Sequence, residues 1–283
     1  MFSTTNQSLI ERRSFLSSLE LKEHSVFPSA PTFAARSAGL KGANVALEAV
    51  ADSARPLSTP TEGKPEAYVD NGSLVSFVNN VPDQQRVDVL NSSLLAQLAA
   101  NKKHDPYNDT ENWFKFYAKV MKNIGWVIQD FEFTEYKTSK MDFKLSQLTL
   151  QILSGLVGGK KEIMKVLKGT LDSLAKDANG VSLFSSKSSS ANKGKFLIAP
   201  CAVDSSKQVT VALLGLHFEA PQNEKNFLFF TWKSSSMKVW VSTQTCTLNE
   251  DLYQQVRDDI RKKLGDKAKT NVLKLELEDI DGE

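Results

Sequence analysis

The sequence has few cysteines, few histidines and little net charge. Two cysteines in 283 residues cannot form the disulfide framework that stabilises many small secreted domains. His24, His104 and His217 are scattered, and neither a CxxC nor an HExxH spacing occurs, so the sequence predicts no metal site and no cofactor. With 35 basic and 33 acidic residues and no basic stripe interleaved with aromatics, it predicts no nucleic-acid partner.

Long apolar runs are also missing. The longest are of the size of "VALLGL" and "FLFF", far short of the roughly 20 residues of a membrane-spanning helix. The first residues lack the basic start and continuous apolar stretch of a secretory signal, because Glu11 and two arginines interrupt them. We therefore expect a protein that is cytoplasmic as synthesised, with two free thiols, and that would leave the cell only by a route without a cleaved signal peptide.

Motifs for nucleotide binding and serine hydrolysis are absent as well. The stretch "GLVGGKKE" lacks both the spacing of a phosphate-binding loop and the Ser or Thr after its lysine. No G-x-S-x-G motif is present, so the pattern of a serine hydrolase has no support.

Residues 1–70 differ from the rest of the chain in being rich in Ser, Ala and Pro, and they are predicted to be irregular or weakly helical. A stripe of Leu9, Leu16 and Leu19 predicts one short helix that docks on the protein's own core rather than on a membrane. The stretch "GANVALEAVADSA" predicts another helix from its propensity.

Residues 71–283 carry the patterns of a single folded domain. Apolar residues at helical spacing predict helices near 82–103, 110–128, 143–157, 160–180 and 250–264. Strands are predicted near 130–136, 195–203, 208–219, 226–232 and 237–245, with an edge strand near 271–280. Short connections between the later strands favour antiparallel hairpins. The expected fold is of the α+β type, an antiparallel β-meander packed with several α-helices.

The stretch "KFLIAPCAVDSS" draws attention to Cys201. Pro200 cannot donate to a sheet ladder, which predicts a strand edge, a bulge or a strand end beside the thiol. Cys201 can be read as a small buried apolar residue, as a catalytic nucleophile, or as an acylation site that needs an apolar cavity. In a hairpin, Cys201 would lie opposite Thr210 and His217 near Gly194, too far apart for a catalytic dyad.

Four stretches carry a resemblance to a known family: "KFLIAPCAVDSS", "VTVALLGLHFEA", "NFLFFTWKSSSMKVW" and "TLNEDLYQQVRDDIRKKL". Over about residues 110–275 the pattern resembles the Erwinia virulence factor (Evf) family of S-palmitoylated bacterial virulence factors. The resemblance implies a single α/β acyl-binding domain over 71–283, with palmitate linked by a thioester to Cys201 inside a hydrophobic cavity. Cys246, between Thr245 and Thr247, fits a lipid cavity less well in sequence.

Three functions remain open from the sequence. The first is a non-enzymatic virulence factor that carries a fatty acid on Cys201 and acts at or near host membranes. Its partners would be a fatty acid or acyl donor and a host membrane. The second is an enzyme, a cysteine-dependent acyltransferase or thioesterase with Cys201 as nucleophile. The third is a lipid-free, toxin-like binding module in which Trp232, Trp240 and the N-terminal leucines contact membranes.

Overall fold

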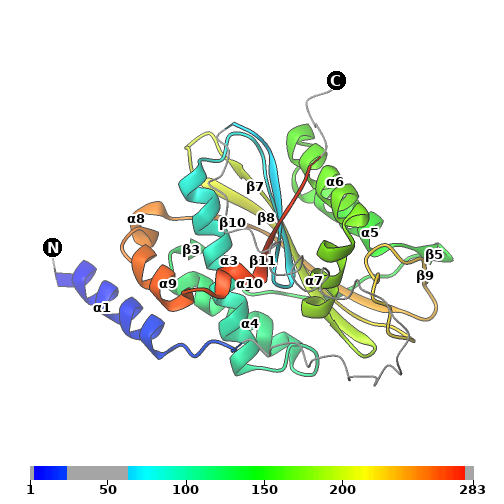
Figure 1. The fold of residues 1–283 in the computed structure, drawn as a ribbon, viewed down its shortest axis with the longest axis horizontal. Helices are drawn as coiled ribbons and strands as arrows, with labels where there is room; N and C mark the ends of the chain where they lie inside the picture. The colour runs from blue at the N-terminus through cyan, green and yellow to red at the C-terminus, as the bar shows by residue number, and fades with distance from the viewer. Residues whose placement is uncertain (1–2, 24–62, 278–283) are drawn as a thin grey trace, which may run out of the picture.

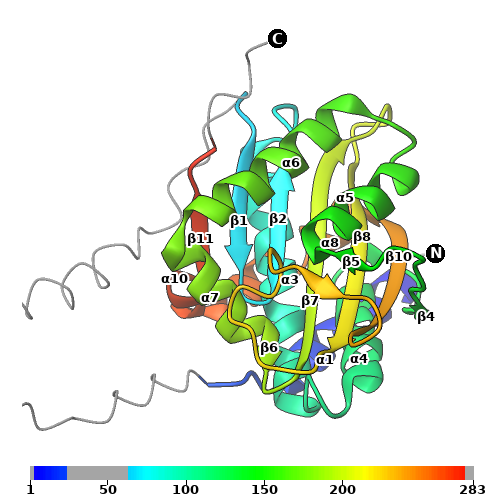
Figure 2. The same ribbon diagram turned by 90° about the vertical axis from the view of Figure 1, so that its right-hand side faces the viewer.

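The computed structural model describes residues 3–23 and 63–277, and in these residues nine strands form one sheet. Helices lie on both faces of this sheet (Figures 1 and 2). One face is covered by α3 (Asp83–Lys103) and α4 (Thr110–Asn123). The other is covered by α5 (Leu145–Leu156), α6 (Lys161–Lys176) and α7 (Ala178–Ser188). The layers are therefore helix, sheet, helix around one hydrophobic core.

The three longest strands form the centre of the sheet. They are β7 (Lys193–Val203), β8 (Val209–Glu219) and β10 (Lys238–Leu248), and β8 pairs antiparallel with both neighbours. Leu197 and Leu213 point towards α3 and α4, since both line a cavity on that side. Because side chains alternate along a strand, their even-numbered neighbours face the opposite layer. The predicted α+β class is confirmed, and so is the antiparallel hairpin of β7 and β8.

The sheet continues on the other side of β7 with three strands. β1 (Glu66–Asp70) and β2 (Ser73–Phe77) form a hairpin, and β11 (Val272–Leu275) adds an antiparallel edge to β1. β2 runs parallel to β7, so the strand order is β11-β1-β2-β7-β8-β10-β3. The sheet thus already begins at Glu66, ahead of residue 71.

The segment 226–232 is not the strand that its apolar residues predict. Turns occupy most of it, and only its end enters the two-residue strand β9 (Trp232–Lys233). The reason is packing: Phe227 contacts the rings of Phe184 and Phe196, and the Trp232 indole N–H donates to the Phe227 carbonyl at 2.9 Å. A cluster of buried rings replaces the alternation of a strand.

Other short elements also differ from the sequence prediction. The serine-rich segment expected to be a loop begins as the end of α7, and the helix expected to reach residue 128 ends at Asn123. In the predicted strand 130–136, Thr134 and Glu135 are the residues paired with β10. The short strands are β3 (Trp126–Val127), β4 (Thr134–Glu135), β5 (Asp142–Phe143) and β6 (Ser189–Ser190). β3 and β4 pair with β10, and β5 pairs with β9.

The C-terminal helix is interrupted. It consists of α8 (Glu250–Tyr253) and α9 (Arg257–Leu264), followed by α10 (Lys267–Asn271). Its N-cap is Asn249, whose side chain accepts from the backbone N–H of Leu252 at 3.1 Å.

The N-terminal helix α1 (Ser3–Ser18) docks on the protein's own core, as predicted. Leu16 and Leu19 are buried. Arg12 donates to the carbonyl of Asn123 at 2.7 Å, and Arg13 forms an ion pair with Asp259. Residues 24–62, with His24 and the alanine-rich segment expected to be helical, lie outside the described residues.

Helix α3 is anchored at two points by buried ion pairs. Arg86, fully buried, donates to Glu66 at 2.8 Å, and Lys274 of β11 also contacts Glu66. Asp88 accepts from Arg257 of α9 at 2.7 Å. Together these contacts fix α3 against β1, β11 and α9.

Candidate functional site

Both cysteines are buried on the face of the sheet that α3 and α4 cover. Cys201 of β7 and Cys246 of β10 are both paired with Val211 of β8, one from each side. Paired residues point to the same face, and two strand spacings separate the thiol-bearing residues by about 10 Å. That separation is too large for a disulfide, and both thiols are free.

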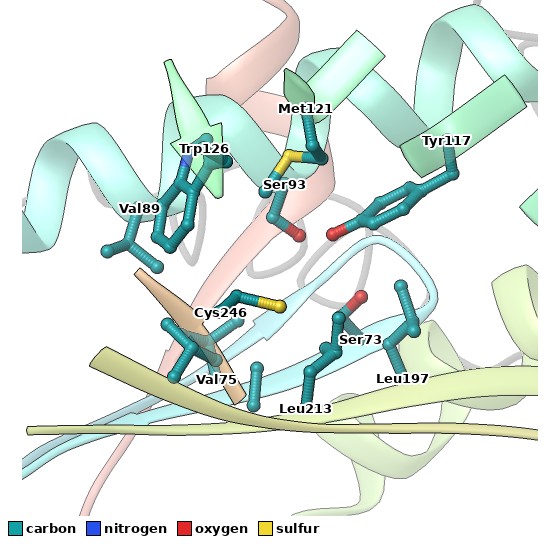
Figure 3. A pocket seen from close by; sticks show the side chains of 12 residues that line it. Ser73, Val75, Val89, Ser93, Tyr117, Met121, Trp126, Leu197, Leu213 and Cys246 are labelled. Atoms are coloured by element: carbon teal, nitrogen blue, oxygen red, sulfur yellow. The ribbon is translucent and has the colours of Figure 1, made fainter. Parts of the chain in front are cut away.

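A small cavity lies between this face of the sheet and the two helices (Figure 3). Its volume is about 20 Å³, room for one water molecule. The sheet contributes Val75, Leu197, Val211 and Cys246, among others, and the helices contribute Val89, Ser93, Tyr117 and Met121. The Cys246 sulfur points into the cavity (Figure 3). Cys201 lies outside the cavity lining, and its thiol donates to the Ala199 carbonyl at 3.2 Å.

Polar groups without partners gather around this otherwise apolar cavity. The Ser73 hydroxyl and the Trp126 indole N–H are buried and have no hydrogen-bond partner among the described residues. The hydroxyls of Ser93 and Tyr117 point towards each other at the rim (Figure 3). Unpaired buried polar groups are destabilising, so their concentration beside one cavity marks this place as a candidate site.

Both thiols are poor nucleophiles in this structure. Burial raises the pKa of Cys246 to about 12. Burial raises the pKa of Cys201 well above its usual range, the neighbouring Cys246 raises it further, and the Arg86 charge offsets only part of the rise. A thiolate is the reactive form of cysteine, so neither thiol is activated as the protein stands.

Pro200 does not mark a strand edge, a bulge or a strand end. It lies inside the central strand β7, and pairing to β8 lapses at Ala199 and Pro200, then resumes in the same register with Cys201 opposite Val211. Pro200 has no backbone N–H to donate, and β7 accommodates it because Ala199 and Pro200 are not paired with β8. The partner of Cys201 is Val211 rather than Thr210, because the turn is closed by Val209.

His217 and Cys201 do not form a dyad, in agreement with the prediction. His217 is paired with Lys195 and with Trp240, towards the other end of β8. Its ring stacks on Trp240, with centroids 4.8 Å apart, and touches the edge of Phe133. Burial lowers the pKa of His217 to about 4, so the imidazole is neutral at physiological pH.

A groove of about 560 Å³ lies where His217 and Trp240 approach the start of α4. Asn108 and Asn112 line it from the α4 side, and Lys193 lines it from β7. Trp240, half-buried here, remains available for contacts in this groove. Trp232 is buried, which excludes the membrane contact suggested for it from sequence.

Two buried charged residues were missed by the sequence analysis. Lys195 is 1% exposed, and its amine has no hydrogen-bond partner in the described part of the chain. Asp70, at the end of β1, is fully buried, and neither carboxyl oxygen accepts a hydrogen bond there by geometry. Burial raises the pKa of Asp70 to about 8, and the nearby Ser93 hydroxyl offsets part of the rise. One signal in the sequence could have indicated that Lys195 is buried. It lies two residues before Leu197, and side chains two residues apart on a strand face the same side of the sheet.

In residues 3–23 and 63–277, no three His, Cys, Asp or Glu side chains come close enough to hold a metal ion. Among the helices described there, none is long and apolar enough to cross a membrane.

Comparison with known proteins shows distant structural relationships. No protein-family model matches the sequence, and comparison with curated proteins gives no match. The structure of the Evf virulence factor covers 69% of this chain and 82% of its own, at 14% identity and a TM-score of 0.36. A delta-endotoxin covers 69% of this chain and 88% of its own, at 15% identity and a TM-score of 0.39.

Proposed function

We propose that this protein is a virulence-related carrier of a long-chain fatty acid, held by a thioester on a thiol in the layer between the sheet and α3 and α4. The observation that carries the proposal is the apolar cavity with the Cys246 sulfur directed into it. The virulence-related part rests on the sequence resemblance in the four stretches described above.

The acyl chain requires the cavity to enlarge. At about 20 Å³ the cavity takes one water, far less than a sixteen-carbon chain. Burial of such a chain contributes on the order of 11 kcal/mol, at about 0.8 kcal/mol per CH₂. This gain opposes the cost of displacing side chains at the helix layer. Met121 is suited to move, because methionine is unbranched and adapts to irregular spaces.

The proposal assigns the thioester to Cys246 on geometry, with Cys201 as the alternative from the resemblance. Cys246 needs only an enlarged cavity, whereas Cys201 also has to give up its contact with the Ala199 carbonyl. Both positions would place the chain in the same layer, because both thiols are on the same face of the sheet.

An acyl-transfer enzyme is the less favoured function. Such an enzyme needs a thiolate and a base in reach of it. Here both thiols have raised pKa values, and His217 lies beside Lys195 instead. A chain buried inside the protein also gains little by moving into a bilayer, so the lipid would stabilise the fold first and act at a host membrane only if released or exposed.

Intact-mass spectrometry of the protein from its native producer tests the carrier function. We expect a mass above that of the bare sequence by one long acyl group, removed by hydroxylamine. A measured mass equal to that of the unmodified sequence would contradict the proposal. Incubation with palmitoyl thioester and acceptor thiols then separates the two functions: one stoichiometric loading supports the carrier, and repeated turnover supports the enzyme.

A further inference from the structure

Lys195 of β7 is a buried lysine whose amine has no hydrogen-bond partner among the described residues. Its amine lies 3.4 Å from the centroid of the Trp113 ring, which contributes a cation–π contact but no hydrogen bond. Burial lowers the pKa of this amine well below its usual value. An ammonium group in such surroundings needs an anionic partner, and no described carboxylate supplies one.

Lys195 lies between the groove and the cavity. Each of four elements lines the groove with one residue and the cavity with another further along. These pairs are Gly194 and Leu197 in β7, His217 and Leu213 in β8, Trp240 and Cys246 in β10, and Asn112 and Tyr117 in α4. Lys195 lies between Gly194 and Leu197 in β7, and Trp113 lies between Asn112 and Tyr117 in α4. The groove, a middle layer and the cavity therefore follow one another along the same face of the sheet.

The middle layer is made of aromatic rings packed over a glycine. Phe114 contacts Trp113 and Phe131, with ring centroids 5.0 and 4.8 Å apart. Both Phe114 and Phe131 lie against Gly215, where an added Cβ would come within 2.8 Å of the Phe131 ring. The side chains of this layer, with the Lys195 amine over the Trp113 ring, thus lie between the groove and the cavity in sequence along these elements.

We propose that Lys195 binds the carboxylate of a long-chain ligand that enters from the groove, with the chain running past Leu197 and Leu213 into the cavity, which has to enlarge in the same way as under the proposed function. The ammonium and the carboxylate form an ion pair, so no net charge is buried. Such charge-assisted pairs are strong where water is excluded. This binding is non-covalent and does not depend on either thiol.

The test uses protein in which no thioester can form, the Cys201→Ser/Cys246→Ser double variant. Equilibrium dialysis with labelled palmitate and with hexadecanol compares an acid and an alcohol of the same chain length. We expect palmitate to bind at least about tenfold more tightly, since an ion pair at this site is worth at least about 1.4 kcal/mol. Adding Lys195→Met should remove the preference, and adding Lys193→Met, in the groove, should leave it intact.

Absence of palmitate binding, or the same preference for palmitate after Lys195→Met, would overturn the inference. A second measurement keeps Lys195 in place: carbodiimide coupling of bound palmitate to the double variant, followed by peptide mapping. An amide on Lys195 is expected, and amides spread over surface lysines such as Lys193 would contradict the proposed site. Because both cysteines are absent, failure here is separate from failure of the thioester.

Discussion

Two groups of buried polar side chains differ in whether they have partners. In the first turns of α3, Arg86 forms an ion pair with Glu66 of β1 and Asp88 forms one with Arg257 of α9. Beside the cavity and the groove, Asp70 and Lys195 are as deeply buried but have no hydrogen-bonded partner in the described chain. The first group holds the fold in place, whereas the second is a source of instability that a ligand could relieve.

The largest effect is expected from breaking a paired group. Arg86→Met removes a fully buried guanidinium together with its ion pair to Glu66. We expect a loss of about 3–5 kcal/mol in the free energy of unfolding, because the buried Glu66 carboxylate loses its buried cationic partner. Denaturant unfolding measures it. The control is Arg13→Met at an exposed ion pair, which should lose less than about 1 kcal/mol. Equal losses would show that the buried pair has no special role.

Asp70 should make stability depend on pH. The folded protein retains the Asp70 proton up to about pH 8, whereas the unfolded chain releases it near its ordinary value of 3.8. Stability from this group is therefore fully present below pH 3.8 and falls as the pH rises towards 8.

Asp70→Asn is the variant that checks this dependence. The amide cannot ionise, so urea unfolding at several pH values should show a flatter profile than the parent between pH 4 and 8. Asp172→Asn, an exposed carboxyl on α6, serves as the control and should leave the profile of the parent unchanged. An unchanged slope in Asp70→Asn would mean that Asp70 is already ionised in the folded protein.

The smallest effect, and the opposite in sign, is expected at Lys195. Burial lowers the pKa of Lys195, so its charged form is less favourable in the folded protein than in the unfolded chain. Lys195→Met removes this penalty and should raise the free energy of unfolding of ligand-free protein by about 1 kcal/mol, a typical size for one substitution. Lys193→Met should change it by less than about 0.5 kcal/mol. A loss of stability in Lys195→Met would show that the contact with Trp113 outweighs the burial penalty.

Elements with a strong period could be predicted from the sequence. Helices α3, α5 and α6, strands β7, β8 and β10, and the edge strand β11 all lie close to their predicted ranges. Each combines an apolar repeat with a clear start or stop, so local signals suffice. The segment 226–232 shows the limit, because its phenylalanines pack into a ring cluster that only tertiary structure defines.

The candidate site was less predictable than the fold. Cys201 stands out in sequence because of Pro200, yet the thiol that faces the cavity is Cys246, flanked by polar residues. Pairing across β8 brings both thiols to one face, and the sequence shows only the hairpin part of that pairing. Asp70 and Lys195 look like ordinary charged residues until their burial is known.

The location of the thioester tests the account most directly. The parent, Cys246→Ser and Cys201→Ser proteins are produced in the native host, and each is measured by intact mass before and after hydroxylamine. The account predicts a labile long-chain adduct on the parent and on Cys201→Ser, and a bare mass for Cys246→Ser. An adduct that survives in Cys246→Ser and disappears in Cys201→Ser would contradict the geometric assignment, and a bare parent protein would contradict the carrier function itself.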